Sequence, residues 1–342
     1  MRLTMLPVQA VQRDIQGTSM KNMTTRWLCG FAAMVLTSSV FAQAWPQRPV
    51  RWVSPFAPGG GTDITSRIIA PKLSSQLGQQ VVVDNRGGAG GMIGVELVAK
   101  SPPDGYTVVL GTVGPIAINV SLYSKMGYDP KKDLVPVAGV ANALNVLVVH
   151  PSLPVKTVKE FVAFAKAHPG QLNYGSSGAG ATDHLAGELF NALTGAKLVH
   201  IPYKGGAPAM LDLISGNVQL VFSTVSTAVG SIQGKRIRAL AMTGNQRFEL
   251  MPELPTMEQA GLKGFEVNNW YALFAPAGTP KEIVSRLNTE VVKILALAEV
   301  QKRLLESGII AAPSSPEQLA AYVAAETRKW AKVIKDANIK AE

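Results

Sequence analysis

Two segments of this chain share one pattern: a short apolar run, a glycine-rich loop and the start of a helical pattern. They cover residues 50–63, with Gly59, Gly60 and Gly61 at the centre, and residues 173–183. A strand that leads through a glycine loop into a helix turns backbone N–H groups toward the positive end of the helix dipole. Each segment therefore predicts an anion-binding site, and two such sites predict that one small acid is bound between them.

Short apolar runs alternate with helical patterns along the chain. We predict strands over 50–54, 81–84, 107–110, 172–174, 197–201, 218–223 and 237–242, and strand-rich runs over 135–149, broken at 141–143, and over 265–275. Helices are predicted over 64–77, 92–99, 158–167, 184–193, 207–215, 281–297, 300–307 and 316–337. Apolar strands between helices are typical of a parallel sheet that is covered on both faces, so the chain is predicted to be α/β.

The order of these elements predicts two α/β lobes around a cleft. The C-terminal helices need a sheet to cover, so we assign residues 45–147 with 269–342 to lobe 1 and residues 148–268 to lobe 2. The two long strand-rich runs would then cross between the lobes and act as a hinge. Two α/β domains in sequence are the alternative.

The N-terminus has the pattern of an export signal. Residues 20–26 form a short n-region made basic by Lys21 and Arg26, residues 27–40 form an apolar h-region, and residues 42–44 (Ala-Gln-Ala) fit the small-x-small cleavage rule. We therefore predict a cleaved signal in residues 1–44, whose true start could be Met20 or Met23, and a soluble secreted protein. A membrane anchor is the alternative, although the apolar run is short for a span.

Composition excludes several kinds of site. The single cysteine, Cys29, lies in the predicted signal, so the secreted chain would have no disulfide, no catalytic thiolate and no cysteine metal site. The net charge of +10 comes from basic residues that are scattered rather than clustered, so no nucleic-acid partner is predicted. A scattered positive excess would still attract anionic ligands.

The glycine loops do not match nucleotide-binding fingerprints. Both Gly-x-Gly-x-x-Gly frames fail at their last position, which is Ile64 in one and Ile93 in the other, and no Gly-x-x-x-x-Gly-Lys-Ser/Thr occurs. Residues 175–179 miss the Gly-x-Ser-x-Gly elbow of hydrolases by one position. The four histidines show no metal-ligand spacing. We therefore predict no cofactor, no metal site and no enzyme activity.

What remains is anion binding by backbone groups. Asp63 and Asp183 stand in the first turns of their helices, where they would cap N–H groups, and Asp63 would close its loop or meet a donor on the ligand. His184 would steady the second loop or contact the ligand. No arginine lies in either loop, so dipoles and water rather than an ion pair would hold the acid. Hydroxyl donors that suit a carboxylate stand at Thr62, Ser176, Ser177 and Thr182.

Several ordered segments carry a resemblance to a known family. They are Trp-Pro at 45–46, Pro-Phe-Ala-Pro-Gly-Gly-Gly-Thr-Asp at 55–63, Val-Asp-Asn-Arg-Gly-Gly-Ala-Gly-Gly at 83–91, Pro-Asp-Gly-Tyr-Thr at 103–107, Leu-Gly-Thr at 110–112, His-Ile-Pro-Tyr-Lys-Gly at 200–205 and Leu-Phe-Ala-Pro-Ala-Gly-Thr-Pro at 273–280. With them the chain resembles the Bug-type periplasmic receptors, the solute-binding components of tripartite tricarboxylate transporters. The resemblance covers essentially all of residues 45–342.

The resemblance implies a type II periplasmic-binding-protein fold, in which two α/β lobes joined by two crossing strands enclose a ligand cleft. It implies a small organic carboxylate as ligand and, as partners, membrane transporter subunits or a sensor ectodomain. We expect a monomer. The ligand-binding residues that the resemblance implies are Phe56, Ala57, Gly59, Gly60, Thr62, Asp63, Thr112, Ser176, Gly178, Ala179, Gly180, Thr182, Tyr203 and Ser223.

Two departures from the family pattern concern the distal end of the ligand. Ser223 and Thr224 stand where many relatives carry an aspartate that can face a ligand amine, which disfavours an amino-acid ligand. Asp183 stands where relatives often have a small residue or proline. Two other functions stay open: a secreted enzyme that acts on an organic acid in the same cleft through Ser177, and a receptor for an inorganic anion.

Overall fold

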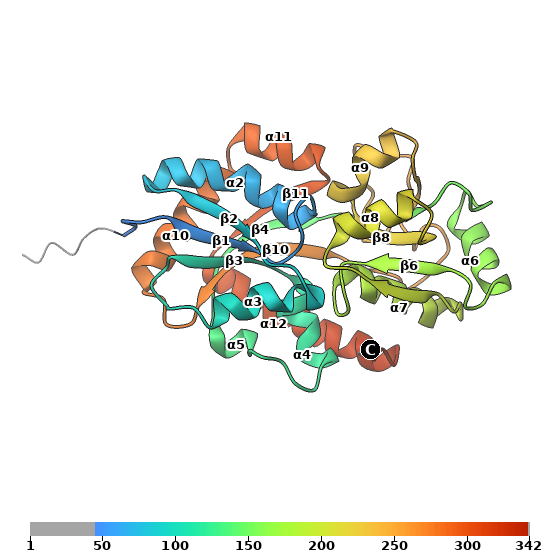
Figure 1. Cartoon of the computed structure of the whole chain (residues 1–342), viewed down its shortest axis with the longest axis horizontal. Helices are drawn as coiled ribbons and strands as arrows, with labels where there is room; N and C mark the ends of the chain where they lie inside the picture. The colour runs from blue at the N-terminus through green and yellow to red at the C-terminus, as the bar shows by residue number, and fades with distance from the viewer. Residues whose placement is uncertain (1–44, 341–342) are drawn as a thin grey trace, which may run out of the picture. The chain divides into compact units, whose positions relative to one another are not determined.

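The computed structural model describes residues 45–340, so the predicted export signal lies outside the described residues. Contacts group the chain from Arg48 onward into one compact unit, separate from Met1–Gln47. No helix in the described part of the chain is long and apolar enough to cross a membrane. Figure 1 shows the ribbon with its helices and strands labelled.

Two β-sheets form the framework of this unit (Figure 1). The first has six strands, in the spatial order β11 (Ile309–Ser314), β4 (Leu134–Ala143), β10 (Asn269–Pro276), β3 (Thr107–Thr112), β1 (Val50–Ser54) and β2 (Val81–Asn85). The second has five strands, in the order β7 (Val199–Pro202), β6 (Asn173–Ser176), β8 (Leu220–Thr224), β5 (Asn145–Val149) and β9 (Arg238–Met242).

Each sheet is mixed rather than parallel. β1 is parallel to its neighbours β2 and β3, and β6 is parallel to β7 and β8. β10 is antiparallel to β3 and β4, and β5 is antiparallel to β8 and β9. The prediction of parallel sheets is therefore wrong for β5 and β10. The reason is that both strands enter their sheets at the edge where the parallel strands end, as the pairs of Asn145 with Thr224 and Tyr271 with Thr112 show.

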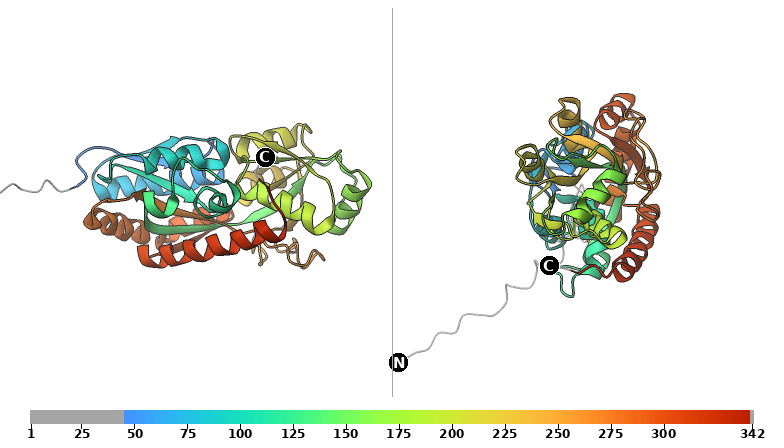
Figure 2. Two further views of the ribbon diagram at one scale, coloured as in Figure 1. Left: turned by 90° about the horizontal axis from the view of Figure 1, so that it is seen from below. Right: turned by 90° about the vertical axis from the view of Figure 1, so that its right-hand side faces the viewer.

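Helices cover both faces of each sheet. One face of the first sheet carries α2 (Gly61–Leu77), α10 (Lys281–Leu295) and α11 (Ala298–Glu306). The other carries η1 (Ala89–Gly91), α3 (Met92–Ala99), η2 (Gly114–Ile118), α4 (Asn119–Leu122), α5 (Pro130–Asp133) and the long C-terminal α12 (Pro316–Asp336), drawn in red in Figure 2. The second sheet packs on α6 (Val158–Ala167) and α7 (Thr182–Thr194), and on α8 (Gly206–Ile214) and α9 (Val225–Gln233).

Most of the predicted elements are confirmed, and the main differences lie near the loops and crossings. α2 begins at Gly61 rather than at Ile64, and the long strand-rich run breaks at Leu144 rather than at residues 141–143. β10 begins at Asn269 rather than at Phe265. The pattern also missed the short elements η1, η2, α4, α5, α9 and β11, most of which directly follow or precede another element.

The chain passes between the two sheets twice. The first passage is at Leu144, between β4 and β5, and the second precedes β10. Two α/β lobes joined by two passages of the chain are thus confirmed, but β4, β5 and β10 each lie within one sheet, so the passages are a break at Leu144 and the segment before Asn269 rather than continuous crossing strands. All of β5 belongs to the second sheet, and the lobe boundaries at residues 147 and 269 stay a prediction.

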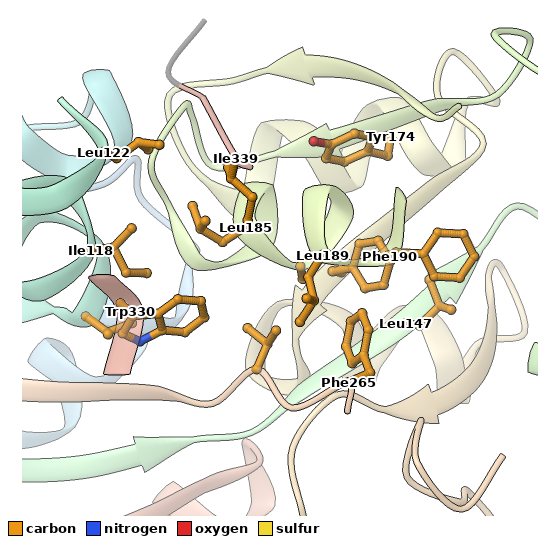
Figure 3. Packing of buried hydrophobic residues seen from close by; sticks show 14 of the residues in the cluster. Ile118, Leu122, Leu147, Tyr174, Leu185, Leu189, Phe190, Phe265, Trp330 and Ile339 are labelled. Carbon is orange, nitrogen blue, oxygen red and sulfur yellow. The ribbon is translucent and has the colours of Figure 1, made fainter. Parts of the chain in front are cut away.

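One hydrophobic cluster reaches from one lobe to the other. Figure 3 shows Leu185 and Leu189 of α7 near Ile118, Trp330 and Ile339, all of them buried. A second cluster lies between the second sheet and the helices α8 and α9. Burial of apolar surface stabilises such contacts by about 25 cal/mol per Å². The shared cluster therefore anchors α7, and with it the second glycine loop, beside the first lobe.

Candidate ligand-binding site

The two glycine loops occupy corresponding places in the two sheets. The first follows β1, the middle strand of a parallel trio, and leads into α2. The second follows β6, the middle strand of the other trio, and leads into α7. Loops at the carboxyl ends of parallel strands are where α/β folds bind ligands. The repeated strand–loop–helix unit that the sequence predicts is confirmed.

A cavity of about 40 Å³ is lined by residues from both loops. A water needs about 10–15 Å³ by this measure, so the cavity has the size of about three waters or of one carboxylate group. Its wall also includes the ends of β3 and β8 and the starts of α8, β5 and β10. The lining residues are Phe56, Gly60, Gly61, Thr62, Thr112, Asn145, Ser177, Ala181, Thr182, Asp183, Gly206, Phe222, Ser223, Thr224, Thr227, Asn269 and Tyr271.

The structure brings part of the predicted ligand-binding set to this cavity. The predicted residues on its wall are Phe56, Gly60, Thr62, Thr112, Thr182 and Ser223. The predicted residues that do not line it are Ala57, Gly59, Asp63, Ser176, Gly178, Ala179, Gly180 and Tyr203. Contact of any of these residues with a ligand stays a prediction.

Asp63 closes the first loop and is paired with an arginine. Its Oδ2 accepts a hydrogen bond from Gly59 N at 3.0 Å, and both of its oxygens accept from Arg67 Nε at 3.0 Å. Burial acts to raise the pKa of Asp63, but the hydrogen bonds from Arg67 and Gly59 outweigh burial and hold this pKa below its ordinary value. The interpretation of Asp63 as the residue that closes the loop is confirmed.

Asp183 makes corresponding bonds in the second loop without a basic partner. Its Oδ2 accepts from Ser177 N at 2.7 Å and from Ser177 Oγ at 2.6 Å, and its Oδ1 accepts from His184 N at 3.0 Å. No lysine or arginine of the described residues contributes to its ionisation. Burial raises the pKa of Asp183 to about 6, against the effect of these hydrogen bonds. A carboxyl group therefore stands, buried, on the wall of the cavity.

The hydroxyl of Ser176 contacts a histidine rather than the cavity. Ser176 Oγ lies 2.5 Å from His200 Nε2 and accepts a hydrogen bond from Gly178 N at 3.1 Å. Burial lowers the pKa of His200 to about 4, so its ring is neutral near pH 7. His184 Nδ1 accepts from Gly180 N at 3.2 Å, which confirms that His184 steadies the second loop.

Glycines permit the second loop to pack against the first lobe. A Cβ on Gly90 would lie 2.2 Å from the carbonyl oxygen of Ala179, and one on Gly114 would lie 2.8 Å from that of Gly180. Such approaches of backbone to backbone leave no room for a side chain. Ala179 and Gly180, which were predicted to contact ligand, therefore form a contact between the lobes in this structure.

Two other predicted residues also take part in contacts away from the cavity. Ala57 N donates a hydrogen bond to Lys204 O at 3.1 Å, which joins the first loop to the second lobe. The hydroxyl of Tyr203 donates to Asp212 Oδ2 at 2.6 Å. These bonds indicate that Ala57 helps to hold the two lobes together and that Tyr203 ties the segment before α8 to Asp212 near the end of that helix.

Sequence reasoning missed two asparagines on the cavity wall. Asn145 is the first residue of β5 and Asn269 is the first residue of β10, the strands that follow the two passages between the sheets. Both side chains are buried, and the Oδ1 atom of each has no hydrogen-bond partner among the described residues. A polar residue at the start of an otherwise apolar strand was the signal available in the sequence.

Tyr271 is a further lining residue that the sequence did not indicate. It is buried, and a Cβ on Gly61 would lie 2.2 Å from its hydroxyl oxygen, so glycine at the start of α2 makes room for this hydroxyl. Burial raises the pKa of Tyr271, so the hydroxyl stays protonated. The other lining residues absent from the predicted set are Gly61, Ser177, Ala181, Asp183, Gly206, Phe222, Thr224 and Thr227.

The cavity wall combines many hydrogen-bonding groups with a single charged side chain. Within residues 45–340, no lysine, arginine or histidine lines it, and Asp183 is its one carboxyl group. Donors come from the first turns of α2 and α7 and from hydroxyls such as those of Thr62, Thr112 and Thr182. Backbone N–H groups at a helix start stabilise an anion without an ion pair.

Two α/β lobes that meet at a small polar cavity, with two helices beginning at its wall, define a solute-binding protein. A family model described as "Tripartite tricarboxylate transporter family receptor" matches residues 65–339, and the chain belongs to this family. The resemblance to Bug-type receptors, with the fold that it implies, is confirmed.

Individual relatives and solved structures agree with this assignment. The chain is 42% identical over 313 residues to a Pseudomonas sp. (strain P51) protein named "UPF0065 protein in tcbD-tcbE intergenic region", covering 90% of this chain and 93% of the relative. It is 36% identical over 306 residues to Protein BugT of Bordetella pertussis, covering 89% of this chain and 94% of BugT.

Two solved structures from Rhodopseudomonas palustris have the same fold. Rpa4515 with adipate has a TM-score of 0.84 and 41% identity, and the match covers 87% of this chain and 99% of that one. MatC with bound malate has a TM-score of 0.82 and 33% identity, and the match covers 85% of this chain and 100% of that one.

Proposed function

We propose that this protein is a periplasmic receptor that binds a small organic carboxylate between its two glycine loops. The observation that carries the proposal is the cavity itself, whose wall includes the first turns of two helices and no basic side chain among the described residues. Such a wall stabilises a carboxylate by preorganised dipoles and hydrogen bonds. The similar structures that hold adipate and malate support an organic acid as the ligand.

The proposal assigns different tasks to the residues of the predicted set. Gly60, Thr62 and Thr182, in the first turns of α2 and α7 or directly before them, would bind one carboxylate of the ligand. Phe56, Thr112 and Ser223 would contact the remainder of the ligand from their places on the cavity wall. Shaping the loops and holding the lobes together would fall to Ala57, Gly59, Asp63, Ser176, Gly178, Ala179, Gly180 and Tyr203.

The receptor would act as an exported monomer with two moving lobes. A signal in residues 1–44 would be cleaved, and lobe 1 (45–147 with 269–342) would close on lobe 2 (148–268) about the crossings, which is the hinge mechanism common to binding proteins. The closed receptor would then deliver its ligand to the membrane subunits of a tripartite tricarboxylate transporter.

A thermal-shift panel tests the proposal. Purified receptor is heated with di- and tricarboxylates, aromatic acids and amino acids, and with phosphate and sulfate. A true ligand at 100 times its Kd adds about 2.7 kcal/mol to the free energy of unfolding. We expect this stabilisation from at least one organic acid, recovered chemically unchanged. Stabilisation by phosphate or sulfate alone, or conversion of the bound acid, would overturn the proposal.

A further inference from the structure

Asn119 is buried where the two lobes touch. It is the first residue of α4, in the first lobe, and none of its surface is exposed. A Cβ on Gly180 of the second glycine loop would lie 2.1 Å from Asn119 Oδ1 and 2.9 Å from Asn119 Nδ2. The preceding residue, Ile118, belongs to the hydrophobic cluster that also contains Leu185 of α7 (Figure 3). The side chain of Asn119 therefore lies directly against the backbone of the other lobe.

The amide group of this side chain has no hydrogen-bond partner. Within residues 45–340, Asn119 is the one residue whose buried side chain leaves two polar atoms, Oδ1 and Nδ2, unpaired. By contrast, Asn191 Oδ1 accepts from Leu198 N at 2.9 Å, and its Nδ2 donates to Leu198 O at 3.1 Å. A buried polar group without a partner loses its hydrogen bonds to water and is destabilising. Contact between the lobes is therefore unfavourable at this point.

The surrounding segment is apolar, so the polar side chain at position 119 stands out. The preceding element, η2 (Gly114–Ile118), is buried throughout and has no polar side chain. An apolar residue at position 119 would avoid the cost of burial. Separation of the lobes also avoids this cost, because it takes Gly180 away and lets water reach the amide. Asn119 does not line the cavity, so its effect on a ligand would act through closure of the lobes.

We propose that Asn119 keeps the empty receptor open, because closure buries its amide unpaired against Gly180. This inference rests on the proposed function, since it uses the same movement of the lobes. The hydrophobic cluster shared by the lobes favours their contact even without ligand, and Asn119 opposes it. A ligand that binds the closed state more tightly then shifts the equilibrium toward closure. The open state is the one that a ligand can enter and leave, so Asn119 favours both capture and release.

Two substitutions at this position should act in opposite directions. Asn119→Ala removes both unpaired atoms, and we expect the empty protein to be more compact than wild type. It should also bind succinate and adipate about fivefold or more tightly. Asn119→Asp keeps the shape of the side chain but adds a charge, whose burial is more costly. We expect it to bind both acids more weakly and to remain expanded when empty.

Asn288→Ala is the matched control. Asn288 Nδ2 donates to Val137 O at 2.8 Å and to Ser314 O at 2.9 Å, and all three residues belong to the first lobe. Its loss should lower the free energy of unfolding in urea and leave the dimensions of the empty protein unchanged. Small-angle scattering measures these dimensions without ligand and with saturating succinate or adipate, and isothermal titration measures the affinities.

The scattering of the empty proteins decides the inference without any ligand. Equal dimensions of empty wild type and empty Asn119→Ala overturn it. Weaker binding of the acids by Asn119→Ala also overturns it, because that result means that the amide stabilises the closed receptor. Asn119→Val, which is closer in volume to asparagine, takes the place of Asn119→Ala if circular dichroism shows that the latter does not fold. Binding of no organic acid at all would refute the proposed function, and the empty proteins would still decide the role of Asn119.

Discussion

The two glycine loops each contain an aspartate that is bonded to the loop backbone, but the charged groups around the two aspartates differ. Asp63 and Asp183 each accept a hydrogen bond from an N–H group of their own loop. Four residues after Asp63 stands Arg67, which forms an ion pair with it. Four residues after Asp183 stands Gly187, where a Cβ would lie 2.3 Å from the ring of Tyr174.

This difference explains why one loop aspartate is structural and the other can affect the binding of an acid. The arginine partner helps to keep Asp63 ionised, and Asp63 does not line the cavity. Because the packing of Tyr174 leaves room only for glycine, no partner can occupy the corresponding position beside Asp183, which stays buried and unneutralised on the wall. The same hydrogen bond from a loop N–H group to an aspartate thus occurs with a basic partner in one lobe and, among the described residues, without one in the other.

The pH dependence of ligand binding should give the largest contrast between the loops. Above pH 6 Asp183 is ionised, so succinate binding requires a proton or brings two negative charges together. We expect the succinate affinity of wild-type receptor to fall between pH 6 and 8 by up to about tenfold per pH unit. Two groups near Asp183 do not contribute to this slope, because burial lowers the pKa of His200 to about 4 and raises that of Tyr271.

Titration calorimetry at several pH values measures this slope, and two variants locate it. Asp183→Asn should show an affinity for succinate that is nearly independent of pH, whereas Asp63→Asn should keep the slope of the wild type. A wild-type affinity for succinate that does not change with pH would contradict the assignment to Asp183.

The next largest effect on ligand affinity should come from disturbing the contact between the second glycine loop and the first lobe. Gly90 has φ of 60°, and its Cβ would lie 2.2 Å from Ala179 O. We expect Gly90→Ala to disfavour the closed receptor by about 1–3 kcal/mol through overpacking. That range corresponds to a loss of about fivefold to 150-fold in ligand affinity.

Gly78→Ala is the matched control for backbone strain. Gly78 has φ of 69°, but nothing lies within 4 Å of the place where its Cβ would stand. It should lose some stability and retain ligand affinity, and small-angle scattering should find only the Gly90→Ala protein expanded in the presence of ligand. Equal losses of affinity in the two variants would mean that strain, not closure, is responsible.

Folding stability should respond to pH with opposite signs in the two loops, and the effect at Asp63 is the smallest expected. The lowered pKa of Asp63 means that its stabilisation is present above its unfolded pKa of 3.8 and is lost as pH falls through the folded value. Asp63→Asn should therefore cost about 0.3–1 kcal/mol at pH 7 and less at low pH.

For Asp183 the folded pKa of about 6 lies above 3.8, so the folded state holds the proton more tightly. The stability of wild-type receptor relative to Asp183→Asn should fall as pH rises from 4 to 6 and then stay constant. Urea unfolding at four pH values between 4 and 7 measures both variants. If the stability of the wild type relative to each of the two variants changed with pH in the same direction, the distinction between the two aspartates would be refuted.

Most of the fold could be predicted from the sequence because its signals are local. Apolar runs and helical spacing located β1, α3, α6 and most other elements to within a few residues. The antiparallel direction of β5 and β10 could not be predicted in the same way, since strand direction depends on the edge at which a strand enters its sheet. Gly61 illustrates the same limit, because its need for glycine comes from Tyr271, distant in the sequence.

The candidate site was predictable only in part. The two loops were evident because glycines and helix caps leave a pattern within a few residues, and Phe56, Thr62 and Thr182 do line the cavity. Asn145 and Asn269 lie far apart in the sequence, and a single polar residue at a strand start carries no sign of its partner. Their meeting at one wall depends on the two passages of the chain between the sheets.

The sequence by itself determined the two strand–loop–helix units, the two lobes and the family, because short-range patterns of glycine, charge and hydrophobicity carry that information. Only the tertiary structure decided which loop residues face the cavity and which join the lobes. It also decided the difference between Asp63 and Asp183, since the pKa of a carboxyl group depends on burial and on the groups that packing places around it.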